Sequence, residues 1–257
     1  MDCMGDNALR REECQPTSRD FRLEKRIETY WNQRSAAFSQ LRLQEAAGPN
    51  GEAWRTLLQE HLPDRRLSIL DIGTGAGFFP LLLAPLGHEV IGVDLSEKMV
   101  QEARKNCLAA GVPARFRKMD AQALDFVDES FDVILSRNLT WTLPDVMEAY
   151  REWHRVLRPQ GILLNFDSDY GCKTFTKTKD ADHVHASLSQ ETLTACNDIK
   201  HQLHISQHRR PFWDARFLDS LGMEVSVDAD IDPRVQRDPS MHYDDVAVFG
   251  IHAKKSS

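Results

Sequence analysis

Short apolar runs alternate along the middle of the chain with segments whose apolar positions follow helical spacing. The apolar runs predict strands at residues 67–72, 89–94, 114–121, 130–138 and 162–166. Helical patterns begin at Phe78 and Ser96, and another precedes the last strand near Glu152. Regular alternation of strands and helices favours right-handed crossovers and a parallel sheet. We therefore expect an α/β domain in this part of the chain.

The N-terminal part has no strand pattern. Residues 1–22 are polar, and we expect them to form a mobile arm. Residues 23–45 have apolar and aromatic positions at helical spacing, and Pro49-Asn50-Gly51 is expected to break that helix. A second short helix is expected at residues 54–62. These helices together, residues 23–62, would form a helical lid and a first helix.

The pattern changes again after the fifth strand. Residues 171–214 are polar and rich in histidine, and they contain one expected helix at 189–202. A short helix at 215–221 and two strands at 223–231 and 246–253 follow, as the closing part of the sheet. We therefore expect the main domain to span residues 63–257, with residues 171–214 inserted in it as a cap over the substrate.

Composition and charge exclude several classes of protein. No apolar run approaches the ~20 residues of a membrane span, and the net charge of −7 argues against broad nucleic-acid binding. Five scattered cysteines favour reduced thiols over a disulfide framework. The polar N-terminus does not resemble a secretory signal. We expect a cytoplasmic protein, monomeric or homodimeric, with no membrane or nucleic-acid partner.

A glycine loop follows the first strand. The residues are Asp71-Ile72-Gly73-Thr74-Gly75-Ala76-Gly77, and the helix predicted from Phe78 comes directly after them. Glycines permit a tight turn and close approach of a ligand, and the helix N-terminus offers free N–H groups. Dinucleotide enzymes favour G-x-G-x-x-G, whereas this loop has G-x-G-x-G. Asp94 ends the second strand 21 positions after Gly73, a position that suits an acceptor for ribose hydroxyls.

These features resemble the motifs of class I S-adenosylmethionine (SAM)-dependent methyltransferases. The resemblance covers residues 66–170 and is closest to the small-molecule branch that includes ubiquinone- and menaquinone-biosynthesis-type enzymes. It implies an α/β, Rossmann-like, doubly wound and mostly parallel sheet with an antiparallel closing strand, and SAM as cofactor. In the family, the loop and its acid hold the amino-acid end of SAM, the second strand's acid takes the ribose, and the third strand's acid takes the adenine. The cofactor residues it implies are Tyr30, Arg34, Asp71, Gly73, Thr74, Gly75, Gly77, Asp94, Leu95, Met99, Asp120, Ala121, Arg137 and Asn138.

The acceptor site is expected from segments outside the core. The helix at 23–45 carries Tyr30, Trp31 and Arg34, which resemble the lid that precedes the core in many small-molecule methyltransferases. The candidate catalytic residues at the same sheet edge are Asp167, Asp169 and Trp141, with an Asp as a possible general base. The histidines of the insertion, His201, His204 and His208 among them, favour a polar or anionic small acceptor. No zinc spacing is present, so no metal is expected.

Two alternatives stay open at this point. A NAD-type oxidoreductase shares a related fold, although the glycine spacing and the lack of a Tyr-x-x-x-Lys motif argue against it. A SAM-binding regulatory or assembly subunit without catalysis would keep the same cofactor motifs. The sequence identifies neither the acceptor nor its reacting atom.

Overall fold

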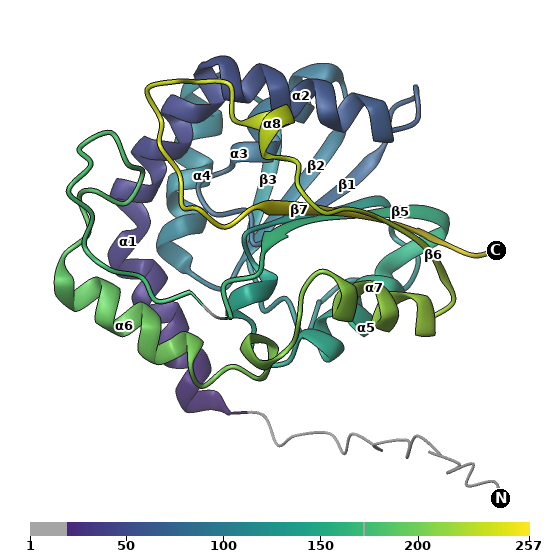
Figure 1. Ribbon diagram of the computed structural model, residues 1–257. Coiled ribbons are helices and arrows are strands. Elements are labelled where there is room, and N and C mark those ends of the chain that lie inside the picture. The colour runs from purple at the N-terminus through teal and green to yellow at the C-terminus, as the bar shows by residue number, and fades with distance from the viewer. Residues whose placement is uncertain (1–19, 172) are drawn as a thin grey trace, which may run out of the picture.

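The computed structural model describes residues 20–171 and 173–257 (Figure 1). Within these residues, seven strands form one sheet in the order β3-β2-β1-β4-β5-β7-β6. The strands are β1 (Ser68–Ile72), β2 (Glu89–Asp94), β3 (Ala114–Lys118), β4 (Phe131–Arg137), β5 (Leu157–Ser168), β6 (Met223–Asp228) and β7 (Val248–Lys255). Strand β7 is antiparallel to both β5 and β6, whereas the pairs from β3 to β5 are parallel. The predicted fold class is confirmed.

Helices cover both faces of the sheet. They are α1 (Phe21–Ala47), α2 (Pro49–His61), α3 (Phe78–Leu83), α4 (Glu97–Ala109), α5 (Val146–Val156), α6 (Gln190–Lys200), α7 (Phe212–Ser220) and α8 (Asp232–Val235). Figure 1 shows α2, α3 and α8 above the sheet and α5 and α7 below it. The alternation of strand side chains supplies both cores: Val133 and Leu135 of β4 pack with α2 and α3, and Ile134 packs with α5.

Several predicted boundaries differ from the structure, and three of the differences can be explained locally. Helix α2 starts at Pro49 instead of residue 54, because proline has no N–H to lose at the first position of a helix. Helix α7 starts at Phe212 instead of residue 215, directly after Pro211. Strand β5 starts at Leu157 instead of residue 162, and residues 157–161 form an irregular start of the strand, where its register with β4 shifts.

The insertion lies against the N-terminal helix. Figure 1 shows α6 beside α1, and the Arg26 Nη1 of α1 donates a hydrogen bond to Gln202 Oε1 at 3.0 Å. Helix α1 also packs on α4, which follows β2. The two additions therefore meet above the carboxyl ends of the central strands. The predicted mobile arm, residues 1–22, falls almost entirely outside the described residues.

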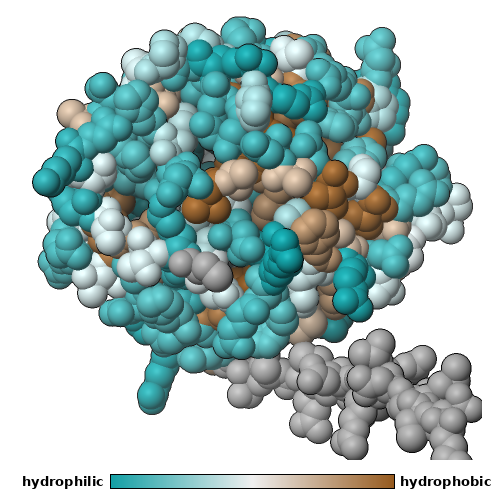
Figure 2. Space-filling view, viewed as in Figure 1, coloured by the Kyte–Doolittle hydropathy of each residue, from teal (hydrophilic) through white to brown (hydrophobic). Residues whose placement is uncertain are grey.

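The outer surface carries both hydrophilic and hydrophobic residues. On the face seen in Figure 2, hydrophobic residues show near the middle of the molecule and hydrophilic residues cover most of the rest. Across the described ranges, none of the helices has the length and apolar character needed to cross a lipid bilayer.

Candidate functional site

The glycine loop joins the carboxyl ends of β1 and β2. Gly73 and Gly75 have φ angles of 70° and 53°, in the left-handed region that favours glycine. The Gly73 N–H donates to Val93 O at 2.9 Å, and the Gly75 N–H donates to Asp94 Oδ2 at 2.9 Å. Thr74 Oγ1 donates to Asp71 Oδ2 at 2.6 Å. The loop is thereby fastened to both strand-end acids.

A cavity of about 710 Å³ lies beyond these strand ends. It brings together nine of the residues that the family resemblance implies for SAM: Gly73, Gly75, Asp94, Leu95, Met99, Asp120, Ala121, Arg137 and Asn138. A smaller cavity of about 340 Å³ shares part of this wall and adds Asp71, Thr74 and Arg42. We call these two spaces together the cofactor cavity. Gly77 lines neither space: it caps α3, and a Cβ there would stand 3.3 Å from that of Ala103 in α4.

The carboxyl groups of Asp71 and Asp94, which hold the loop, have raised pKa values. Burial raises the pKa of Asp71 to about 7, and the charge of Asp94 adds to this effect. Burial also raises the pKa of Asp94 to about 6, although the N–H groups of Ser96 and Gly75 oppose the shift. In the described part of the chain, neither carboxyl forms an ion pair. Such groups suit a ligand that brings its own hydroxyl or ammonium donors.

A second cavity, of about 890 Å³, adjoins the first. We call it the acceptor cavity. Eight of its lining residues are aromatic: Tyr30, Trp31, Phe38, Trp54, Trp141, Tyr170, Phe175 and Tyr243. Five residues line both this space and the cofactor cavity: Trp31, Phe38, Arg42, Arg137 and Asn138. The rings suit a flat molecule, and the charged side chains of the same wall leave the expectation of a polar or anionic acceptor open.

A buried cluster of charges stands where the two cavities meet. Glu45 of α1 accepts a hydrogen bond from Arg137 Nη2 at 2.6 Å and also pairs with Arg42. Burial alone would raise the pKa of Glu45, but the two guanidinium groups outweigh it and hold the pKa at about 2. The Arg137 guanidinium lies 4.4 Å from the ring centre of Trp54. Two cations and one anion leave this wall with a net positive charge.

Unpartnered atoms lie at the same junction. Arg137 Nε and Nη1 and Asn138 Oδ1 are buried and have no hydrogen-bond partner among the described residues. Asn138 has a φ of 53°, in the left-handed region that few residues other than glycine and asparagine adopt. Buried polar atoms cost free energy when they stay unpaired. The junction therefore fits a ligand that supplies polar partners, as a bound cofactor and acceptor would.

The predicted catalytic residues separate into two groups. Trp141 lines the acceptor cavity, and its Nε1 donates to Asn138 O at 3.1 Å. Asp167 and Asp169 line neither cavity. Asp167 is fully buried beneath the site, where it accepts hydrogen bonds from Thr140, the Trp141 N–H, the Ser168 N–H and Arg210. Both carboxylate oxygens of Asp167 therefore accept hydrogen bonds from this chain, and the side chain stabilises the floor beneath the acceptor cavity without lining it.

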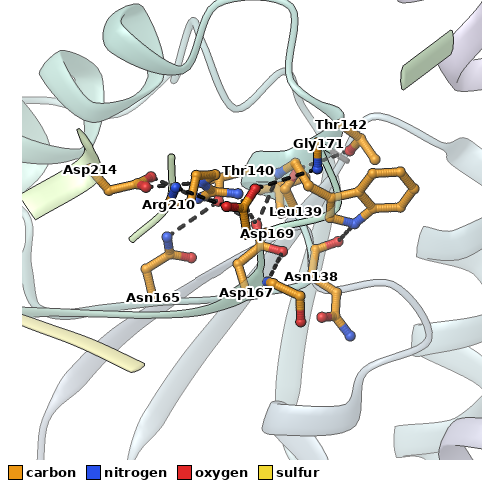
Figure 3. Close-up of polar contacts among 12 residues, drawn as sticks. Asn138, Leu139, Thr140, Thr142, Asn165, Asp167, Asp169, Gly171, Arg210 and Asp214 are labelled. Carbon is orange, nitrogen blue, oxygen red and sulfur yellow. Dashed lines mark hydrogen bonds and ion pairs between the residues drawn. The ribbon is translucent and has the colours of Figure 1, made fainter. Parts of the chain in front are cut away.

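Figure 3 shows the network around Asp167. Arg210, from the insertion, reaches between Asp167 and Asp214, and its Nη2 donates to Asp214 Oδ1 at 2.7 Å. Tyr150 of α5 donates to the same Asp214 oxygen at 2.7 Å. Asp169 accepts a bond from the Arg210 N–H at 3.2 Å. The network fastens the insertion to β5 directly below Trp141.

The lid and insertion residues are placed differently from the expectation. Tyr30 and Arg34 line the acceptor cavity and not the cofactor cavity. The Arg34 Nη1 donates to Tyr30 Oη at 3.0 Å, and its guanidinium lies 5.4 Å from the Trp31 ring. His204 and His208 contact each other at 3.1 Å, and they and His201 line none of these cavities. A different histidine, His185, lines the acceptor cavity together with Asp244.

The one group of potential metal ligands within the described ranges is Asp180, Asp182 and His242. Their ligand atoms lie within 4.8 Å of one another, and all three residues are exposed. His242 Nδ1 already bonds Asp180 at 2.6 Å. The group lies outside the cavities, and its hydrogen bonds join the loop that contains Asp180 and Asp182 to the loop that contains His242.

The strand order, the glycine loop after β1 and the acid at the end of β2 define the class I methyltransferase fold. Residues 70–165 match the family model described as "Methyltransferase domain". Residues 70–165 of the chain therefore form a methyltransferase domain of the SAM-dependent type.

Individual relatives agree with this assignment. The "Uncharacterized methyltransferase YcgJ" of Bacillus subtilis is 34% identical over 145 residues, which cover 52% of this chain and 57% of that protein. A "Ubiquinone biosynthesis O-methyltransferase" of Sinorhizobium fredii is 34% identical over 102 residues, 40% of this chain and 41% of that protein. The matches thus span about half the length of these curated relatives. The fold is similar to the crystal structure of a SAM-dependent methyltransferase from Aquifex aeolicus, with a TM-score of 0.55, 19% identity, and coverage of 82% and 95%.

Proposed function

We propose that this protein transfers a methyl group from SAM to a small acceptor bound in the aromatic cavity. The observation that carries the proposal is the junction of the two cavities. Trp31, Phe38, Arg137 and Asn138 line both, so a cofactor on one side and an acceptor on the other would be in contact there. When bound, SAM supplies an activated methyl group on a positively charged sulfur.

The chain's own residues would hold the cofactor by complementary chemistry. We assign the ribose hydroxyls to Asp94 and the amino-acid end to Asp71, Thr74 and the glycine loop, whose carboxyl groups and N–H groups lie together at that edge. We assign the adenine to the wall formed by Leu95, Met99, Asp120 and Ala121. The apolar side chains can pack on the base, and the polar ones can bond its edge.

The charge and the aromatic side chains of the acceptor cavity indicate the chemical class of acceptor that it would bind. Arg34, Arg42 and Arg137 line the acceptor cavity together with Glu45 and Asp244, so its wall has an excess of one positive charge. Desolvation there strengthens every charge interaction. We propose an aromatic or otherwise flat acceptor with negative character, closed in by α1 and the insertion. The lid role of α1 is part of this proposal.

A larger side chain in the acceptor cavity should lower the rate of methyl transfer without changing the affinity for SAM. Leu188 lines only the acceptor cavity. We expect Leu188→Trp to lower methyl transfer at least about tenfold while SAM affinity stays within about threefold, because the added ring occupies acceptor space alone. The measurement is formation of S-adenosylhomocysteine by the purified protein, given SAM and a set of small phenols, carboxylic acids, amines and thiols.

Leu108→Trp is the matched control, since Leu108 is 82% exposed and lies outside both cavities. Equal rates for the two variants would contradict the assignment of the aromatic cavity to the acceptor. Tight SAM binding without product from any acceptor would instead favour a non-catalytic SAM-binding subunit.

A further inference from the structure

Two loops are joined beside the acceptor cavity, one near residue 184 and one near residue 243. The Val184 N–H donates to His242 O at 2.8 Å, and the His242 N–H donates to Asp182 O at 3.1 Å. These backbone bonds place Asp244 Oδ2 3.3 Å from His185 Nε2. Both side chains line the acceptor cavity. A histidine and a carboxylate from distant parts of the chain thus form a pair at the wall of this cavity.

The two ring nitrogens of His185 have different surroundings. Nε2 faces the Asp244 carboxylate, which favours the tautomer with the proton on Nε2. Nδ1 is shielded from solvent and has no hydrogen-bond partner in the described part of the chain. In this tautomer Nδ1 is the atom with a free electron pair. The ring is therefore oriented, and one nitrogen is left to accept a proton.

The charges around the pair suit a base at neutral pH. Burial lowers the pKa of His185, and Arg34 and His183 add to that effect, while Asp244 opposes it. Burial would raise the pKa of Asp244, but the hydrogen bond from His185 outweighs it and holds that pKa below the ordinary value. His183 Nε2 lies 3.9 Å from the other oxygen of Asp244. A neutral imidazole beside an ionised carboxylate is the state that a general base requires.

We propose that His185, oriented by Asp244, is the general base that takes the proton of an aromatic hydroxyl acceptor during its methylation. The inference rests on the proposed function and specifies its substrate class. A tertiary amine or a thioether has no proton to lose, so a base at this wall is useful only for a protonated acceptor. The rings of Trp31, Trp141 and Phe175 favour an aromatic one.

The step balances as one proton transfer and one displacement. The hydroxyl proton passes to His185 Nδ1, and the resulting imidazolium is paired with Asp244. The electron pair of the acceptor oxygen forms the bond to the methyl carbon. The pair of the broken sulfur–carbon bond stays on sulfur, which becomes the neutral thioether of S-adenosylhomocysteine.

The test compares His185→Gln with the wild-type protein on a series of phenols of graded acidity, including phenol, 4-methylphenol and 4-nitrophenol. We expect kcat for phenol to fall about 10²- to 10³-fold, with SAM affinity and the KM for phenol within about threefold. The loss should shrink for 4-nitrophenol near pH 8.5, because that acceptor is already ionised and needs no base. Wild-type kcat/KM should fall with acid at a pH below the ordinary imidazole range, because the pKa of His185 is lowered, and His185→Gln should lose this acid limb of the pH profile.

His204→Gln is the control, because His204 is an exposed residue of the same insertion and lines neither cavity. Asp244→Asn tests the positioning role and should retain part of the rate with a shifted pH profile. A loss in His185→Gln that is equal for all phenols, or no loss, would overturn the inference. SAM binding without methylation of any phenol overturns it as well, whereas a wild-type protein that does not bind SAM overturns the proposed function itself.

Discussion

Replacing Arg210 by Met is expected to lower the free energy of unfolding by about 3–5 kcal/mol. Arg210 is buried between Asp167 and Asp214, neither of which is exposed to solvent. Burial alone raises the pKa of Asp167, and Arg210 opposes that shift. Without the guanidinium, two buried carboxyl groups would lose their cation. Denaturant titration of the wild-type and Arg210→Met proteins measures the change.

Arg66→Met is the matched control for this loss. The Arg66–Glu89 ion pair joins side chains that are 70% and 55% exposed, at 3.0 Å. Water and salt screen such a pair, so its removal should cost less than about 1 kcal/mol. The Arg210→Met deficit should also become smaller in acid, since the pKa of Asp167 is raised and its carboxylate can then be protonated. Similar losses for both variants would show that the Arg210 network does not hold the insertion on β5.

Asp94→Ala is expected to weaken SAM binding by about 1–3 kcal/mol, or roughly 5- to 150-fold. The change removes the carboxylate at the end of β2 that we assign to the ribose, and it also removes the acceptor of the Gly75 N–H. Titration calorimetry measures the affinity, with circular dichroism to show that the fold is kept. Glu89→Ala, at the opposite end of β2, should bind SAM as the wild type does.

The same assignment predicts how SAM affinity depends on pH. In the free protein the pKa of Asp94 is about 6 and that of Asp71 is about 7. A protonated carboxyl accepts hydrogen bonds poorly, so cofactor binding should release protons and weaken as the pH falls from about 8 to 5. Affinity that stays constant over this range, or an Asp94→Ala protein that binds SAM normally, would remove Asp94 from the cofactor site.

The cofactor side of the site could be predicted because its signals are local in sequence. The glycine loop, Asp94 and Asp120 each follow a strand directly, and parallel strands bring such positions to one sheet edge. The structure gathers them as expected. Short apolar runs likewise identified the central strands, since each of these strands buries side chains on both faces of the sheet.

The acceptor side could not be predicted in this way, because its residues come from separated segments. Arg42 and Glu45 stand three residues apart on a helix, a spacing that is usually a surface pair, and only Arg137, 92 residues after Glu45, makes them a buried cluster. Asp167 was expected at the site, but Arg210 from the insertion binds it below the cavity. His185 had no local signal that distinguished it from the other histidines of the insertion, and its partner Asp244 lies 59 positions later (244 − 185).

Calorimetric titration of the purified protein with SAM and, separately, with NAD⁺ tests the central claim most directly. The cavity beyond β1 and β2 is assigned to SAM on the G-x-G-x-G loop, the strand-end acids and the unpartnered atoms of Arg137 and Asn138. We predict that SAM binds at one site per chain, that S-adenosylhomocysteine competes for it, and that NAD⁺ releases no heat of binding. Binding of NAD⁺ in the absence of any SAM binding would contradict the account.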